Sequence, residues 1–333
     1  MLENKLISVV IPAYNNPEYT LKTLNSIYAQ TYRPIEIILS DDCSPNSLDN
    51  IVENFKIKND DKFIIKYFKQ KNNLGYFYNL RFCLTKANGH YLIMLDHDDW
   101  LVDDEYFFET IKNISKRKNC FVGIGNTFFE NVTGTYLNFF YNNWNYINGK
   151  HFLKYNLYKS INPCKSSIIM NLQKLREINY LQFLPDQNTL LDKKNSPDEG
   201  YILISLLLPH GDLAITGKVF SVRGSPTNSL SKKDFWLKNN NNKHFVPLYN
   251  LMKYYKTINF KDGMFVMLIN ILFRFSQSKI NFNLLKHYKY SYKVFLIILI
   301  SNFIFYIKYI YKLPFDIINF VKKKIIFILR LFQ

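Results

Sequence analysis

The chain has only four cysteines among its 333 residues, and they stand far apart at positions 43, 83, 120 and 164. No Cys-x-x-Cys pair occurs, which argues against a zinc ribbon, a thioredoxin-type redox site and a disulfide scaffold. With 11 glycines and 11 prolines, the sequence is neither collagen-like nor of low complexity. Hydrophobic residues make up 48% of the chain, enough for a substantial core, so wholesale disorder is excluded.

Glycine-rich phosphate loops are also missing. The sequence contains neither the GxGxxG fingerprint of dinucleotide-binding folds nor the GxxxxGK[ST] loop of P-loop enzymes. Both absences argue against a nicotinamide-dependent dehydrogenase and against a P-loop NTPase. A nucleotide bound by this chain would need another way to neutralise its phosphates, and a divalent cation held by one or two carboxylates provides one.

Apolar runs are too short for a secretory signal or a membrane span. The run from Leu6 to Ile11 follows no basic stretch and breaks at Pro12, so we expect a cytoplasmic protein. The longest uncharged run near the end, from Val294 to Ile307, has 14 residues. As a helix it would span about 21 Å, which is less than the roughly 30 Å of a bilayer core.

Short apolar segments alternate with amphipathic ones along the first hundred residues. The pattern predicts strands at 6–11, 35–39, 63–68 and 91–95, with helices at 17–28, 48–55 and 76–86. Alternation of this kind predicts an α/β fold, with a mixed but mostly parallel sheet and helices on both faces.

Polar or acidic residues follow three of these strands: Tyr14-Asn15, Asp41-Asp42 and the segment from Asp96 to Asp99. Because ligands bind at the carboxyl ends of strands in such sheets, we expect these residues to share one rim. Clustered carboxylates repel one another unless a cation or a donor-rich ligand lies among them.

Five motifs in order carry a resemblance to a known family. They are Ile7 to Asn15 (a first strand), Ser26 to Thr31 (S-x-x-x-Q-T), Asp41 to Ser44 (DDGS, with Cys43 for Gly), Asn72 to Gly75 (N-x-G) and Asp96 to Asp98 (D-x-D). Together they cover about the first 110 residues, and they resemble the family 2 glycosyltransferases. The resemblance implies a GT-A fold and sugar transfer with inversion.

The resemblance also implies roles for individual residues. Nucleotide-binding residues would be Pro12, Tyr14, Asp42, Asn73, Asp96 and Arg223, with Tyr14 stacking on the base and Asp42 accepting a base N–H. Strand parity alone does not separate Asp41 from Asp42. Asp98 and Asp96 would bind Mn²⁺ or Mg²⁺ on the diphosphate, while Asp99 is interpreted as an acidic residue at the start of a helix.

The family usually places its general base in a Glu-Asp pair that opens a helix. Here Asp198 and Glu199 stand at that location in reversed order, before an aliphatic run. Glu199 is the expected base and Asp198 the alternative. Both could instead be acids at a helix start. Farther on, the segment from Val222 to Ser231 resembles a loop that closes over the donor, without the usual histidine.

The last part of the chain is strongly basic. From Phe245 to Gln333 there are 14 Lys and Arg against two acidic residues, which is +12 of the total net charge of +17. Basic and apolar residues together favour an anionic membrane surface over nucleic acid, although a helical bundle packed on the protein is the alternative. We therefore expect a GT-A domain made of a nucleotide-sugar-binding half, 1–125, and an acceptor-binding half, 126–232. A helical, basic, membrane-associating region, 233–333, is expected to follow.

The sequence thus predicts a glycosyltransferase peripheral to the inner face of the cell membrane. It would move one sugar, hexosyl or N-acetylhexosaminyl, from a nucleotide-diphospho-sugar to a hydroxyl of a lipid-linked or surface glycan. A UDP-linked donor is expected, and capsule or lipopolysaccharide assembly is the expected context. Two other functions stay open: an inactive membrane-associated adaptor with this fold, and a sugar nucleotidyltransferase.

Overall fold

The structure, a computed structural model, describes residues 5–57, 63–130, 132–135, 143–153, 163–184, 199–225, 254–255 and 257–259. The chain divides into two compact units, Met1–Phe152 with Ile161–Phe235, and Leu153–Ser160 with Trp236–Gln333. The sheet and the candidate site belong to the first unit. The predicted basic region lies outside the described residues, except for positions 254–255 and 257–259.

A single mixed sheet organises the first unit. Its strands are β1 (Ile7–Ala13), β2 (Ile35–Asp41), β3 (Phe63–Lys69), β4 (Tyr91–Met94), β5 (Asp99–Leu101), β6 (Cys120–Phe129), β7 (Val132–Thr135), β8 (Asn145–Asn148), β9 (Ile168–Asn171) and β10 (Asp212–Arg223). Their order is β3-β2-β1-β4-β9-β6-β10-β5, with β7 beside β6 and β8 beside β10. The first four strands in this order are parallel, and β9 then runs antiparallel to both β4 and β6.

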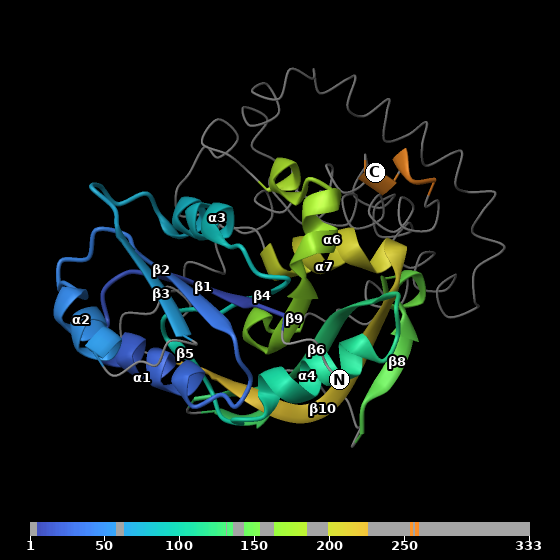
Figure 1. Cartoon of the computed structure of the whole chain (residues 1–333), viewed down its shortest axis with the longest axis horizontal. Coiled ribbons are helices and arrows are strands. Elements are labelled where there is room, and N and C mark those ends of the chain that lie inside the picture. Colours follow the sequence, from blue (N-terminus) through green and yellow to red (C-terminus); the bar gives the residue numbers. More distant parts are fainter. Residues whose placement is uncertain are drawn as a thin grey trace, which may run out of the picture. The chain divides into compact units, whose positions relative to one another are not determined.

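Helices cover both faces of the sheet. They are α1 (Pro17–Tyr28), α2 (Asp49–Ile57), α3 (Tyr76–Lys86), α4 (Tyr106–Ser115), α6 (Leu172–Glu177) and α7 (Glu199–Leu207). In Figure 1, α1, α2 and α4 lie on one side of the sheet, and α3, α6 and α7 lie on the other. No described helix is long and apolar enough to cross a membrane.

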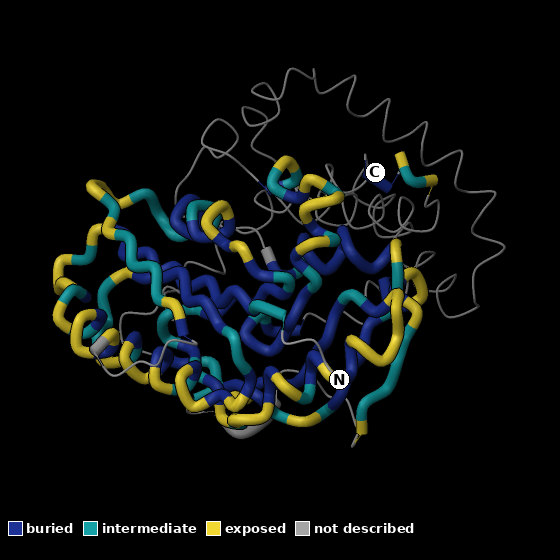
Figure 2. Tube along the Cα trace, viewed as in Figure 1, coloured by how far each residue is buried: buried dark blue, intermediate teal, exposed yellow. Residues whose placement is uncertain are grey.

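Two interior strands of the sheet explain why the sequence favours this arrangement. Every residue of β1 and β2 is buried, as expected for parallel strands with helices on both faces. Figure 2 shows this dark buried centre, with exposed positions on the outer helices and loops. The expected alternation of strands and helices is confirmed through β4. Because β6 crosses position 125, both predicted halves share the one sheet.

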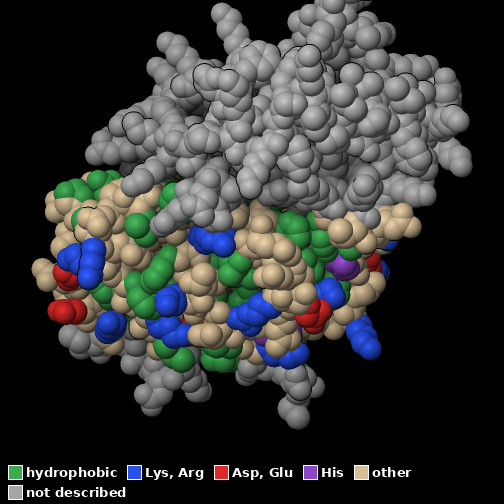
Figure 3. Space-filling model, turned by 90° about the horizontal axis from the view of Figure 1, so that it is seen from above, with side chains coloured by type: hydrophobic (Ala, Val, Ile, Leu, Met, Phe, Trp, Pro, Cys, Tyr) green, Lys and Arg blue, Asp and Glu red, His purple; other side chains and the backbone are tan. Residues whose placement is uncertain are grey.

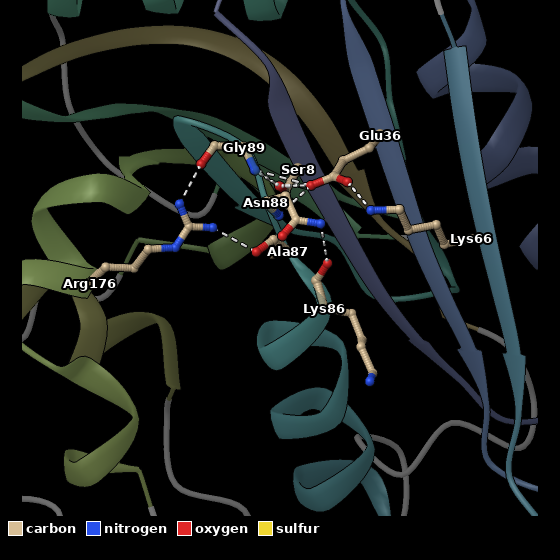
Figure 4. A network of polar contacts seen from close by, with 8 residues as sticks. All are labelled: Ser8, Glu36, Lys66, Lys86, Ala87, Asn88, Gly89 and Arg176. Carbon is tan, nitrogen blue, oxygen red and sulfur yellow. Dashed lines mark hydrogen bonds and ion pairs between the residues drawn. The ribbon is translucent and has the colours of Figure 1, made fainter.

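A buried carboxylate joins three segments at the amino ends of the strands (Figure 4). Glu36, at the start of β2, accepts hydrogen bonds from Ser8 and from the backbone N–H groups of Asn88 and Gly89. Lys66 of β3 forms an ion pair with its other oxygen, with an N–O distance of 2.7 Å. The chain needs glycine at position 89, because an added Cβ would lie 2.7 Å from the backbone oxygen of Leu6. This network lies at the opposite ends of the strands from the candidate site, so its role is structural.

Replacing Glu36 by glutamine is expected to lower the free energy of unfolding by about 2–3 kcal/mol, because the amide has one acceptor oxygen in place of two and no charge to pair with Lys66. The side chain is 1% exposed. Urea denaturation measures the change. The matched control is Glu53→Gln, the same substitution at an exposed position of α2, which should stay within about 0.5 kcal/mol of the parent.

The same pair of proteins tests the ionisation of Glu36. Burial acts to raise its pKa, but the bonds from Lys66, Ser8 and Asn88 lower the pKa overall, below the ordinary 4.5. A carboxyl with a lowered folded-state pKa adds stability that is present above its unfolded-state pKa and is lost as the pH falls through the folded-state pKa. The stability gap between the parent and Glu36→Gln should therefore narrow below pH 4.5. A gap that widens on acidification would contradict this assignment.

Candidate functional site

Three loops leave the sheet at one edge. Strands β2, β1 and β4 are adjacent and parallel, so the residues that follow them emerge side by side. These residues are the segments 14–16, 42–44 and 95–98, which contain the polar and acidic residues that the sequence singled out. The shared rim expected from the sequence is therefore present.

The first loop presents an aromatic ring to solvent. Tyr14 is 45% exposed, whereas the strand residues before it are buried. Asn15 and Asn16 both adopt left-handed backbone conformations, which turn the chain sharply into α1. The loop is fixed to the next one, because the Asn15 N–H donates to the Ser44 hydroxyl at 2.7 Å. An exposed ring held in this way is suited to stacking on a flat ligand.

Asp41 and Asp42 have different partners. Asp42 accepts hydrogen bonds from the N–H groups of Leu74 and Gly75 at 2.6 and 2.8 Å, and the Asn73 amide donates to its backbone oxygen. Asp41 instead accepts from the N–H and hydroxyl of Ser44 and from Tyr67. The turn containing Asn73 is thus tied to the rim through Asp42. Pro12 lies buried within β1, below this edge.

The acidic turn after β4 brings three carboxylates together. Asp96 is 21% exposed and its Oδ1 lies 2.8 Å from Lys165 Nζ and 3.0 Å from the Tyr76 hydroxyl. Burial raises the pKa of Asp98, and the negative charge of Asp96 adds to that shift although His97 opposes it. Burial and the charges of Asp96 and Asp98 raise the pKa of Asp99 to about 8. The carboxylates of this turn repel one another, and a bound cation would reduce that repulsion.

The interpretation of Asp99 as a helix-start acid is wrong. Asp99 begins strand β5, and α4 starts only at Tyr106. The Asp99 carboxylate accepts from the Ser166 hydroxyl at 2.7 Å and from the Gly224 N–H at 3.2 Å. Through these hydrogen bonds, the buried Asp99 side chain connects the acidic turn to two later segments of the chain.

Side chains of helix α1 and of the residues that follow it hold the acidic turn in place. The Thr23 hydroxyl lies 2.9 Å from the backbone oxygen of His97 and 2.6 Å from that of Asp99. Ser26 accepts from the N–H of Leu101, and the Gln30 amide donates to the backbone oxygen of Asp103. Ser26 and Gln30 belong to the S-x-x-x-Q-T motif. That motif therefore has a structural explanation: it holds the chain that follows the acidic turn.

Arg223 reaches the site at the end of β10. It lies opposite Asp99 in the antiparallel pairing of β10 with β5, and its charge acts to lower the pKa of both Asp96 and Asp99. The next residue must be glycine, since a Cβ on Gly224 would collide with the backbone oxygen of Asp98. Glu130 completes the turn by accepting from the Ser225 N–H at 2.7 Å.

Sequence reasoning missed the segment that opens β9. Lys165 contacts Asp96 and Tyr76, and its neighbour Ser166 contacts Asp99. The short turn η1 (Lys165–Ser167) touches β4, β5, β6 and β10. Its only sequence signal is a polar cluster, Lys165 to Ser167, directly before an apolar strand, which alone does not indicate a ligand site.

Two carboxylates in one turn fit a particular kind of metal site. Within the described ranges, no group of three or more His, Cys, Asp or Glu side chains is arranged to hold a metal ion. Asp96 and Asp98 do interact through their charges. Magnesium-type sites commonly use one or two carboxylates and complete the coordination with substrate phosphates. The turn therefore fits a metal whose remaining ligands come from a phosphorylated substrate.

The expected catalytic pair is only partly described. Glu199 is the first residue of α7, so a helix does begin at this acid. Asp198 and the side chain of Glu199 lie outside the described residues, as does the loop after Ser225.

Comparisons with known proteins agree with this geometry. The family model described as Glycosyl transferase family 2 matches residues 8–177, about half of the chain. Glycosyltransferase GlyG of Streptococcus pneumoniae serotype 4 is 31% identical over 149 residues, 45% of this chain and 46% of that protein.

A second relative carries a more specific name, UDP-Glc:alpha-D-GlcNAc-diphosphoundecaprenol beta-1,3-glucosyltransferase WfaP of Escherichia coli. It is 34% identical over 124 residues, 35% of this chain and 47% of that protein. The matched segment thus spans less than half the length of either relative.

Among solved structures, S. aureus TarS 1-349 in complex with UDP-GlcNAc has a similar fold, with a TM-score of 0.54 at 16% identity. The match covers 80% of this chain and 81% of that one. The fold expected from the five motifs is therefore present. With the family model matched over both the rim and the acidic turn, the chain belongs to glycosyl transferase family 2.

Proposed function

We propose that the protein transfers a single sugar from a nucleoside-diphosphate sugar to a hydroxyl group of a lipid-linked or surface glycan, with inversion. The observation that carries this proposal is the rim itself. An exposed aromatic ring, Tyr14, and a pair of interacting carboxylates, Asp96 and Asp98, follow neighbouring parallel strands. One end of such a rim suits a flat base and the other suits a metal-bound diphosphate.

The donor roles follow from these positions. Tyr14 stacks on the base, and Pro12 and Asp42 form its surroundings, with Asp42 accepting a base N–H. Each carboxylate oxygen of Asp42 accepts one backbone N–H, from Leu74 or from Gly75, and these bonds fix the orientation of the carboxylate. The Asn73 side-chain amide donates to the backbone oxygen of Asp42 and so helps to fix this residue.

The phosphate side combines acids and bases. Asp96 and Asp98 hold Mn²⁺ or Mg²⁺, which when bound offsets the negative charge that develops on the departing diphosphate. Arg223 contacts the diphosphate from the end of β10. The Asp99–Gly224 bond keeps Arg223 next to the acidic turn.

Glu199 is the proposed general base and Asp198 the alternative. As the acceptor oxygen forms its bond to the anomeric carbon, the bond from that carbon to the phosphate oxygen breaks. The hydroxyl proton passes to the carboxylate, and the nucleoside diphosphate leaves. A single displacement of this kind inverts the anomeric centre.

The known relatives support the substrate class. The similar TarS structure is a complex with UDP-GlcNAc, and the name of the E. coli relative includes UDP-Glc and a diphosphoundecaprenol-linked sugar. We propose a UDP-linked donor and a lipid-linked acceptor, as in capsule or lipopolysaccharide assembly. The basic segment 245–333 would hold the enzyme on the anionic inner face of the membrane, as a peripheral protein that binds no nucleic acid.

The decisive experiment measures nucleoside diphosphate release from UDP-, GDP- and dTDP-sugars, with Mn²⁺ and with EDTA. Lipid-linked acceptors are supplied in half of the reactions. Release from one donor that requires the metal is the expected result, and NMR of the product reports the anomeric configuration. If no donor reacts and calorimetry detects no binding of UDP, GDP or dTDP with Mn²⁺, the proposal is wrong and a catalytically inactive adaptor takes its place.

A further inference from the structure

We propose that Lys165 is a diphosphate-binding residue that gives this enzyme a metal-independent component of donor binding. The inference rests on the proposed function, since it concerns the same donor. It assigns a role to a residue that none of the five sequence motifs contains.

The ammonium group of Lys165 lies in the acidic turn itself. Its Nζ is 2.8 Å from Asp96 Oδ1, donates to the Tyr76 hydroxyl and lies 4.5 Å from the centre of the Tyr76 ring. Three contacts of one cation with two residues fix its position. A phosphate that binds beside Asp96 would therefore come close to this ammonium.

The Lys165 side chain is buried enough to be held and exposed enough to be reached. Its exposed fraction is 17%, beside 21% for Asp96. Charged hydrogen bonds at such a site are stronger than on the open surface, because less water competes with them. In contrast, Lys69 pairs with Asp49 at 2.6 Å, but both side chains are more than 40% exposed.

The contacts of the neighbouring residue also fix the position of Lys165. The adjacent Ser166 donates to Asp99, so this segment is bonded to the acidic turn through two consecutive side chains. Arg223 acts on the same carboxylates from β10. Two cations, one just before β9 and one at the end of β10, thus flank three carboxylates from the turn after β4.

That balance of charge points to a phosphate ligand. Lys165 lies 2.8 Å from Asp96, and Arg223 is paired with Asp99 across β5 and β10, so two cations stand beside these carboxylates before any metal arrives. An incoming diphosphate would then meet two cationic side chains beside the carboxylates. On the face shown in Figure 3, described Lys and Arg side chains are scattered among other residues.

The test is a calorimetric titration of the full chain with UDP, GDP and dTDP and with the matching monophosphates, in EDTA and in Mn²⁺. The variants are Lys165→Met and Lys165→Arg. The matched control is Lys174→Met, which removes a lysine of similar exposure, 27%, that pairs with Glu177 at 2.7 Å away from the rim.

In EDTA, Lys165→Met should weaken diphosphate binding about tenfold and leave monophosphate binding nearly unchanged. Lys165→Arg should restore part of the loss, and the Lys174 variant should match the parent. Equal losses for mono- and diphosphates would reduce Lys165 to a structural role and overturn the proposal. Parent protein that binds diphosphates only with Mn²⁺ would also overturn it while leaving the proposed function intact, whereas no binding in either condition would defeat both.

Discussion

Replacing Asp98 by asparagine is expected to lower donor turnover about a thousandfold while leaving the folded chain at least as stable as the parent. The loss follows from the proposed role of Asp98 as a metal ligand. The stability follows from the geometry of the turn, because Asp98 is a half-buried carboxyl beside Asp96 and its pKa is raised. Removing its charge removes a repulsion.

The two readouts separate function from folding. Nucleoside diphosphate release measures turnover, and thermal denaturation without metal measures stability. Asp104→Asn is the matched control, an exposed acid six positions along the chain, and it should change neither readout. Loss of both activity and stability in Asp98→Asn would show instead that the carboxylate is part of the scaffold.

Alkylation of Cys43 is expected to abolish donor binding, and a nucleoside diphosphate should protect the thiol. Cys43 is exposed and directly follows Asp42, whereas Cys83, Cys120 and Cys164 are buried. Burial raises the pKa of the other three thiols to about 12, 11 and 11. A maleimide at neutral pH should therefore modify position 43 selectively and fill the base end of the rim.

Cys43→Gly supplies the control for this experiment. Cys43 has a φ of 62°, a left-handed conformation that glycine adopts without strain, so the variant should fold and remain active. It should also resist the reagent. Mass spectrometry locates the adduct and calorimetry measures UDP binding. Full binding by singly modified protein would place the nucleotide away from Cys43.

Much of the nucleotide-binding half could be predicted because its signals are local. The helix expected at 76–86 is found as Tyr76–Lys86, and the strand expected at 35–39 is found as Ile35–Asp41. In both segments, the spacing of apolar residues over a short stretch of sequence is enough to predict the type of element.

The misinterpretation of Asp99 has a physical reason. Its partners, Ser166 and Gly224, lie 67 and 125 residues along the chain. The residues next to Asp99 resemble a helix start, but pairing with β10 makes them a strand. Local propensity was overridden by a contact that only the tertiary fold creates.

The same limit explains the missed Lys165. A lysine before an apolar strand has no distinguishing sequence pattern. Its role depends on its contact with Asp96, which only the tertiary fold creates. Glu36 is similar, because a single acid inside a buried strand gains meaning only from Asn88 and Gly89, more than 50 residues later. Motifs indicate the family, while the two cations beside the carboxylates, Lys165 and Arg223, lie beyond the last of the five motifs.

Helix α1 connects the loop that carries Tyr14 to the acidic turn, so a change at one affects the position of the other. The helix starts at the loop that carries Tyr14, and its Thr23 hydroxyl contacts the backbone of the acidic turn. A base that fits poorly would displace the start of α1 and, through Thr23, the backbone of the acidic turn. Exchanging the base-side loop for that of another transferase would therefore retune catalysis as well as donor choice, and a graft intended to change specificity should include α1 together with the loop.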